Sequence, residues 1–223
     1  MITIAIDGPA SAGKSTIAQR AAKELGFIYV DTGALYRAIG LFAHENKITD
    51  TDEAALAPRL PDITVELAFE DGKQLIFLNG RNVTEEIRSP AMGMAASNVS
   101  ALPAVRAFLL DLQRDLAKKY NVIMDGRDIG TVVLPQADLK IFLTATPEDR
   151  AMRRYMEFVT RGERIRYEEV LRDIKVRDEN DSTRATAPLK QADDAILLDT
   201  TGNELEESIT LVLELIRARG IGG

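Results

Sequence analysis

The chain has 223 residues, of which 45% are hydrophobic, so it is long enough to bury one core domain with a small insertion. It carries a formal net charge of −7, and it contains no cysteine and a single histidine. The acidic balance argues against a nucleic-acid polymer as partner, and the residue counts exclude disulfides, thiolate catalysis and metal sites built from cysteine or several histidines.

The first predicted elements are a strand, a glycine-rich turn and a helix. An apolar run at residues 2–6 precedes the sequence GPASAGKST, from Gly8 to Thr16, which is a glycine, four residues and then Gly-Lys-Ser. After a buried strand, this spacing aims several backbone N–H groups at one point, where a polyphosphate can bind. We therefore predict a nucleoside triphosphate site, with an ordinary glycine-rich turn as the alternative.

The residue types of this turn suit a phosphate site. Gly8 and Gly13 let the backbone approach a ligand closely, and Lys14 brings a positive charge to the β- and γ-phosphates. Ser15 offers a hydroxyl group to Mg²⁺. The expected ATP-binding residues are Gly8, Pro9, Ala10, Ser11, Ala12, Gly13, Lys14, Ser15 and Thr16.

Five short apolar runs alternate with helical patterns, at residues 2–6, 27–30, 122–124, 140–143 and 195–198. Strands separated by helices pair in parallel, which predicts an α/β fold with a doubly wound five-stranded parallel sheet. Four of the runs end in an aspartate, at Asp7, Asp31, Asp125 and Asp199. Ligands of such sheets bind at the carboxyl ends of the strands, so we expect these four ends at one site.

Residues 61–89 change to period-two alternation, with apolar side chains at every second position from Ile63 to Phe69. Asp71-Gly72 and Asn79-Gly80 are hairpin-turn signals. We expect a small antiparallel β insert that moves as a lid or clamp beside the acceptor, with a surface meander as the alternative. Residues 1–60 and 90–223 then form the core domain.

The segment from about 150 to 187 is expected to be an arginine-rich lid, because nine of the nineteen arginines lie between Arg150 and Arg184. Thr146-Pro147-Glu148 predicts the start of a helix there. Phosphoryl transfer depends mainly on positioning and on neutralising charge with Lys, Arg and Mg²⁺, so this composition suits a kinase. A solvated face is the alternative for the three arginines of this helix, Arg150, Arg153 and Arg154.

Two more helices are expected to turn apolar stripes toward the core, at residues 100–119 and 205–216. The chain has no apolar stretch long enough to span a bilayer and no charged-then-apolar leader. We therefore expect a cytoplasmic protein with no membrane partner.

Several blocks of the sequence together resemble one enzyme family. They are IDGPASAGKST, DTGALYR, AAS before an AVR helix, DGRDIGTVV and IKVRDENDSTRATAPL, in this order and over essentially the whole chain. They resemble the cytidylate kinases of the bacterial type. The resemblance implies a P-loop kinase fold, transfer of the γ-phosphoryl group of ATP to CMP or dCMP, and Mg²⁺ with ATP. We expect a monomer with these small-molecule substrates.

The resemblance also implies roles at the acceptor phosphate and ribose. Arg37 and Arg127 would bind the 5′-phosphate, a role that suits the planar, bidentate guanidinium group. Arg177 and Asp181 would hold the ribose hydroxyls, and Arg184 would reach toward the phosphates. Taken without the family, the spacing of the last three residues equally fits solvated salt bridges on a helix.

At the base, Ser97, Arg106 and Asp128 would read the cytosine edge, with the carboxylate accepting from the exocyclic amino group. Tyr36 would form a wall of the acceptor pocket, although a core tyrosine has the same pattern. Thr32 stands where the family often has serine, and it keeps the hydroxyl group.

The predicted catalytic residues are Lys14, Arg154 and Arg184, which would neutralise charge on the transferring group. Ser15 is the expected metal ligand, and Asp125 would hold Mg²⁺ through a water molecule, with a helix or turn cap as the alternative. The adenine is expected near residues 200–203 and the lid.

Two rival functions remain open from the sequence. One is another small P-loop kinase, for UMP, thymidylate or shikimate. The other is a GTPase-like switch, which needs an Asn/Thr-Lys-x-Asp run after a late strand. The nearest match, Asn46-Lys47-Ile48-Thr49, lacks the aspartate and lies too early in the chain.

Overall fold

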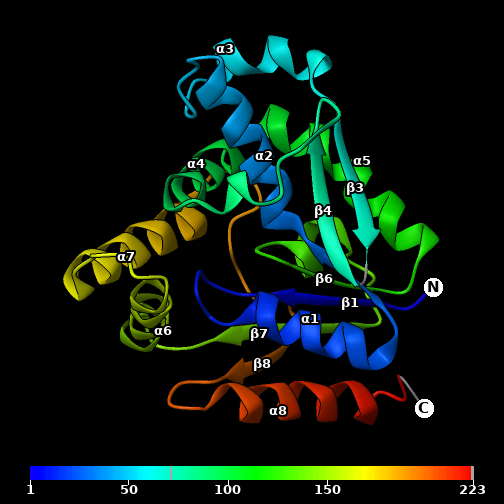
Figure 1. The fold of residues 1–223 in the computed structure, drawn as a ribbon. Helices are drawn as coiled ribbons and strands as arrows, with labels where there is room; N and C mark the ends of the chain where they lie inside the picture. The colour runs from blue at the N-terminus through cyan, green and yellow to red at the C-terminus, as the bar shows by residue number, and fades with distance from the viewer. Residues whose placement is uncertain (71, 222–223) are drawn as a thin grey trace.

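The computed structural model describes residues 1–70 and 72–221. At its centre is a parallel sheet with the strand order β2-β6-β1-β7-β8 (Figure 1). Its strands are β1 (Thr3–Asp7), β2 (Ile28–Asp31), β6 (Val122–Gly126), β7 (Leu139–Thr144) and β8 (Ile196–Asp199). The predicted five-stranded parallel sheet is confirmed, with each strand within two residues of its apolar run.

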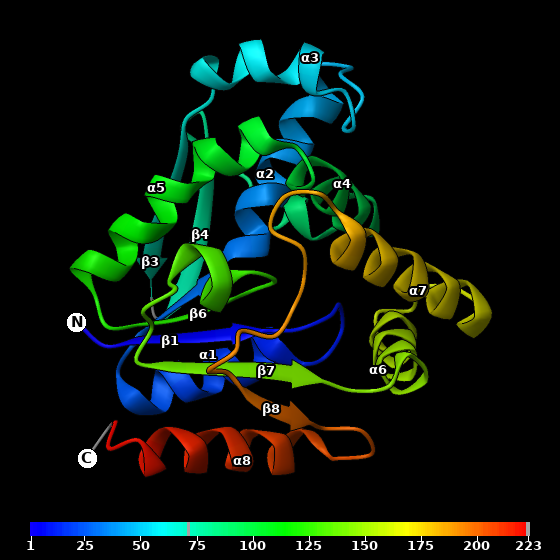
Figure 2. The ribbon, with the colours of Figure 1, turned by 180° about the vertical axis from the view of Figure 1, so that it is seen from behind.

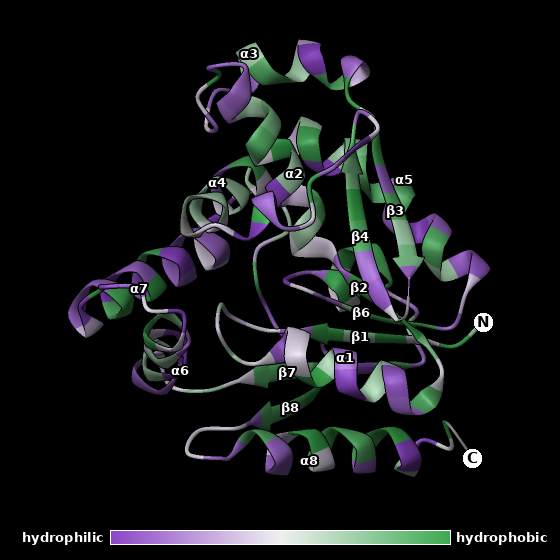
Figure 3. Cartoon of the chain, viewed as in Figure 1, coloured by the Kyte–Doolittle hydropathy of each residue, from purple (hydrophilic) through white to green (hydrophobic). Residues whose placement is uncertain are grey.

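Helices cover both faces of the sheet, as expected for a doubly wound fold. On one face, α1 (Lys14–Leu25) and α8 (Leu205–Ala218) bury Ile17 and Val212 against strand residues such as Ile123. On the other face, α5 (Pro103–Lys119) and the short π-helical turn η3 (Ile129–Val133) pack against Val122 and Met124. The strands are green along most of their length when coloured by hydropathy (Figure 3).

The expected antiparallel insert is present as β3 (Val65–Glu70), β4 (Lys73–Leu78) and β5 (Arg81–Asn82). The turn predicted at Asp71-Gly72 includes residue 71, which lies outside the described residues. Ile76 and Leu78 of the hairpin share a buried cluster with Leu35 and Ile39. Gln74 also binds the backbone of Asp31, accepting from its N–H at 2.8 Å and donating to its carbonyl at 3.2 Å. Motion of the insert as a clamp stays a prediction.

Between β2 and α5, short segments surround this hairpin. They are α2 (Thr32–Glu45), α3 (Glu53–Leu56), η1 (Ala57–Asp62), η2 (Glu86–Arg88) and α4 (Pro90–Ser100). Helices α2 and α4 pack closely because a small residue lies at their crossing: a side chain added at Gly40 would come within 2.9 Å of the Ala95 Cβ.

The segment expected to be a lid forms α6 (Pro147–Thr160) and α7 (Tyr167–Thr183), which project beyond the carboxyl ends of the strands (Figures 1 and 2). Its motion stays a prediction, and the name lid is kept for this segment. The predicted helix start is confirmed, because the Thr146 hydroxyl accepts from the Asp149 N–H at 3.3 Å and Pro147 follows the cap. The lid has its own small apolar cluster, formed by Ala151, Phe158, Val170 and Ile174.

One core prediction is wrong: Leu205, at the start of α8, is 45% exposed and faces the cavity described below, while the other stripe residues of this helix are buried. Across residues 1–70 and 72–221, no single helix is long and apolar enough to cross a membrane, although the bent pair α4–α5 passes that test by length and composition. The start of β1 and the end of α8 lie at the amino end of the sheet, away from α6 and α7 (Figure 2).

Candidate active site

The phosphate loop joins β1 to α1 through a backbone that few residue types can adopt. The φ angles of Gly13, Ser11 and Gly8 are 88°, 59° and 150°. Gly8 also packs closely against β7, because a Cβ at this position would lie 1.9 Å from the Leu143 carbonyl oxygen. The first helical hydrogen bond of α1 runs from the Ile17 N–H to the Gly13 carbonyl at 3.1 Å. The preceding N–H groups of the helix start are therefore directed toward an anion position.

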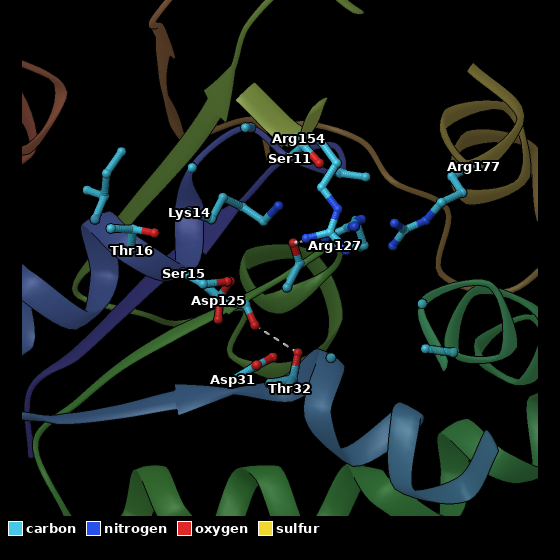
Figure 4. A pocket seen from close by; sticks show the side chains of 18 of the residues that line it. Ser11, Lys14, Ser15, Thr16, Asp31, Thr32, Asp125, Arg127, Arg154 and Arg177 are labelled. Atoms are coloured by element: carbon cyan, nitrogen blue, oxygen red, sulfur yellow. Dashed lines mark hydrogen bonds between the residues drawn. The ribbon is translucent and has the colours of Figure 1, made fainter. Parts of the chain in front are cut away.

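Lys14 points its ammonium group into the cavity (Figure 4). Its Nζ donates to the Pro9 carbonyl at 2.7 Å, and the side chain is buried. Burial, together with the positive charge of Arg127, lowers the pKa of Lys14 to about 7. A bound polyphosphate would favour the charged form of this lysine.

Asp125 is a buried carboxylate at the end of β6. It accepts from the Ser15 hydroxyl and from the Tyr29 hydroxyl, each at 2.9 Å. Burial and the neighbouring Asp31 raise the pKa of Asp125 to about 6. Thr32 Oγ1 donates to the Asp125 carbonyl at 2.8 Å, so the predicted acceptor residue Thr32 also supports this strand end.

The oxygen atoms around Asp125 fit a magnesium ion, which prefers carboxylate, hydroxyl and phosphate oxygens. Burial and the charge of Asp31 disfavour the ionised form of this carboxylate, and a bound cation would favour it. In the part of the chain that the structure describes, no group of three or more His, Asp or Glu side chains could hold a metal ion. Mg²⁺ at this position would therefore take most of its ligands from phosphates and water.

Four residues predicted to bind the acceptor phosphate and ribose line the same part of the cavity. Arg127 Nε donates to Asp181 at 2.7 Å, and Arg37 Nη2 donates to Asp31 at 2.6 Å. Among the described residues, the Nε atoms of Arg37 and Arg177 are buried without a hydrogen-bond partner. Burial and the charge of Arg127 lower the pKa of Arg177 to about 10. Two of these guanidinium groups thus keep a buried N–H group without a partner, as expected where an anion binds.

Asp181 is 3% exposed and also accepts from the Ser97 hydroxyl at 3.2 Å. The alternative of solvated salt bridges is therefore wrong for Asp181, and it is wrong for the buried Arg184. Ser97 is brought to this group as predicted.

At the base end, the Asp128 carboxylate pairs with Arg106 Nη2, and Arg184 Nη2 lies 3.5 Å from its other oxygen. The Arg106 guanidinium group lies 5.6 Å from the centre of the Tyr36 ring. Arg184 also donates to the Ser100 hydroxyl at 3.0 Å. The structure thus brings Arg184 next to Asp128 and Ser100, and its role at the phosphates stays a prediction.

The arginines of α6 differ from one another. Arg150 is buried, pairs with Asp178 of α7 at 2.6 Å and donates to the Ala10 carbonyl at 3.0 Å, so a solvated face is wrong for it. Arg153 donates to the Thr200 carbonyl at 2.6 Å. Arg154 pairs with Glu157 at 2.7 Å and lines the cavity.

Apart from Arg150 and Asp178, the charged side chains described above line one cavity of about 660 Å³, which runs from the phosphate loop to Asp128. Ten of its lining side chains are cationic and six are acidic, although the whole chain is acidic. Asp31 and Asp125 line it, whereas Asp7 binds backbone N–H groups and Asp199 accepts from Thr201 N at 2.9 Å. The prediction that four strand ends converge here is therefore right for two of the aspartates.

The sequence analysis did not identify Tyr29, Ser100 or Asp178. Tyr29 follows the expected strand pattern of a core residue, and no local signal marks its hydroxyl as a partner of Asp125, 96 positions away. Asn203, in the segment expected near the adenine, lines the cavity next to Leu205.

Comparisons with known proteins agree with the geometry. A family model described as cytidylate kinase matches residues 4–218. A cytidylate kinase of Caldicellulosiruptor bescii is 51% identical over 214 residues, covering 96% of this chain and 95% of that protein. One of Lactobacillus johnsonii is 47% identical over 219 residues, covering 98% and 95%. An uncharacterized protein from Eubacterium ventriosum, 10% identical with a TM-score of 0.53 and coverage of 98% and 99%, shares the fold alone.

Proposed function

The chain belongs to the cytidylate kinase family, and from this premise we propose that it transfers the γ-phosphoryl group of ATP to CMP or dCMP, giving ADP and CDP or dCDP. The observation that carries the proposal is the single cavity that joins the phosphate loop to the Arg106–Asp128 pair. Donor phosphates and an acceptor base can occupy its two ends together, which is the condition for direct transfer.

On the donor side, the loop N–H groups and Lys14 would hold the β- and γ-phosphates. Arg154, from the lid, would reach the transferring group after releasing Glu157, because both side chains line the cavity. Mg²⁺, held next to Ser15 and Asp125, would neutralise charge on the donor phosphates.

On the acceptor side, Arg37, Arg127 and Arg177 would bind the 5′-phosphate, and Asp181 would hold a ribose hydroxyl. Two of these guanidinium groups have buried, unpartnered Nε atoms, which supports an anion here. Asp128 would accept from the exocyclic amino group of cytosine. Uracil has a carbonyl oxygen at that position and would leave the carboxylate facing another acceptor.

The chemistry then needs positioning more than proton transfer. An oxygen of the acceptor 5′-phosphate, already ionised at neutral pH, would attack the γ-phosphorus in line with the departing ADP oxygen. One P–O bond forms, one breaks, and no covalent intermediate with the enzyme is required. Closure of the lid would exclude the water that otherwise hydrolyses ATP.

An ADP-release assay tests the proposal with CMP, dCMP, UMP, TMP and shikimate as acceptors. We expect turnover with CMP and dCMP and a much lower kcat/KM for the other three. Preferred turnover with UMP, TMP or shikimate would identify another small P-loop kinase. ATP binding without transfer to any acceptor would favour the nucleotide-dependent switch.

A further inference from the structure

Asp7 is a buried carboxylate at the junction of β1 and the phosphate loop, and the mechanism above does not use it. Its Oδ1 accepts from the Ile129 N–H at 2.8 Å, and its Oδ2 accepts from the Gly130 N–H at 2.7 Å. The side chain is only 5% exposed. These two N–H groups are the first of the η3 turn, so Asp7 caps a turn more than 120 positions away in the sequence.

The residue that begins this turn is Asp128. An aspartate in that position ordinarily folds its carboxylate back onto the N–H groups of its own turn. Here the Asp128 side chain makes no such bond and is directed to Arg106 and Arg184 instead. A side chain in that position ordinarily accepts from the second or third N–H group of its turn, and the second, that of Gly130, is occupied by Asp7.

We propose that Asp7 is a positioning residue, which caps the η3 turn in place of Asp128 and so leaves the Asp128 carboxylate free to read the acceptor base. The inference rests on the proposed function, because it concerns selection of cytosine. Asp7 also directly precedes Gly8, so the same carboxylate fixes the base-reading turn relative to the phosphate loop.

Two acceptor oxygens are needed for this role. An ionised carboxylate supplies both, whereas a protonated one or an amide presents a hydrogen toward one of the two N–H groups. Burial raises the pKa of Asp7 to about 6, and the two N–H groups oppose that shift. The charged groups that act on it are Asp128, which raises the pKa, and Lys14, which lowers it.

The test is the variant Asp7→Asn, assayed with CMP and UMP. Loss of one buried hydrogen bond should raise the KM for CMP about tenfold and lower the CMP:UMP preference by a similar factor. The KM for ATP should change less than about threefold, since the loop backbone is retained. Asp138→Asn is the matched control: it alters a carboxylate that accepts from the Thr3 N–H at 2.7 Å, at the other end of β1, and should leave the preference unchanged.

A second variant keeps the test decisive if Asp7→Asn does not fold. In Gly130→Ala the new Cβ would lie 3.3 Å from Asp7 Oδ2 and 3.0 Å from the Lys140 side chain. This crowding should weaken the Asp7 contact and cause a smaller loss of preference. In an Asp128→Ala background, Asp7→Asn should cause no further loss of the CMP:UMP preference. A wild type without preference for CMP would refute the proposed function. If the wild type prefers CMP, the Asp7 inference alone would be refuted by either of two results: Asp7→Asn and Gly130→Ala both keep the full preference, or the losses caused by Asp7→Asn and Asp128→Ala add up in the double variant.

Discussion

Lys14 is a residue whose protonation depends on whether a phosphate ligand is bound. In the ligand-free cavity it is buried beside Arg127, and its pKa lies near 7. Three or four phosphate charges would reverse that environment and return the pKa toward the value for an exposed lysine. The free and bound proteins then differ in proton content above pH 7.

We therefore predict that ATP binding at pH 8 takes up a proton at Lys14. Calorimetry in buffers of different ionisation enthalpy should detect up to about one proton, and affinity should fall up to tenfold per pH unit above 7. Lys14→Ala should fold normally, bind ATP weakly without this uptake and lose most turnover. Equal uptake in this variant, or near-normal kcat, would contradict the assignment.

Asp128 is the residue that we propose selects the base, so its removal should act on selectivity. In Asp128→Ala the CMP:UMP preference should fall by about 1–3 kcal/mol, the usual cost of a lost buried polar contact. Because the variant leaves Arg106 and Arg184 buried beside a vacated carboxylate, a lower Tm should accompany the change. Steady-state kinetics on the folded variant decide the matter, and an unchanged ratio would reject the role.

At the scale of elements, α6 and α7 are joined by the ion pair between the buried Arg150 and the half-buried Asp178. Arg150 also donates to the Ala145 and Ala10 carbonyls, so this guanidinium group connects the lid to the phosphate loop. A lid motion that separates α6 from the phosphate loop would therefore break the Arg150–Ala10 hydrogen bond.

Asp178→Ala should lower the free energy of unfolding by about 3 kcal/mol, because it leaves the Arg150 charge buried without its partner. Urea denaturation measures the loss. Asp173→Ala removes an exposed carboxylate from the same helix and should change stability by less than about 0.5 kcal/mol. Equal effects of the two substitutions would show that the Arg150–Asp178 pair does not stabilise the fold more than an exposed carboxylate does.

The β insert is joined to the sheet through Gln74, which binds both backbone groups of Asp31. Gln74→Ala should cost about 1–3 kcal/mol because it leaves buried polar groups without partners. Hydrogen exchange should accelerate in β4 and at the end of β2. Lys73→Ala, on the exposed neighbour, should leave both measurements unchanged.

At the scale of the whole molecule, local patterns predicted the elements well and long-range partners poorly. The five strands, the phosphate loop and the antiparallel insert follow from hydrophobic periodicity and turn residues, which act within a few positions. The contacts of Arg184 could not be predicted because its neighbours Ser100 and Asp128 lie 84 and 56 positions away, and no periodicity encodes that meeting. The same holds for Asp7 and its cap on η3.

Ligand occupancy should also stabilise the whole chain. ATP at 100 times its Kd should raise the free energy of unfolding by about 2.7 kcal/mol, since only the folded state holds the complete cavity. Thermal unfolding with and without ATP measures this shift. Lys14→Ala at the same ATP concentration should show a much smaller shift, and an equal one would argue against binding at the phosphate loop.

The start of β1 and the end of α8 lie on the side of the sheet opposite the lid (Figure 1). An affinity tag, a fluorescent fusion or a surface tether attached at either terminus would therefore stand clear of the substrate entrance. Immobilised protein should keep the turnover of the free enzyme, which makes this chain suitable for single-molecule recording of lid movement.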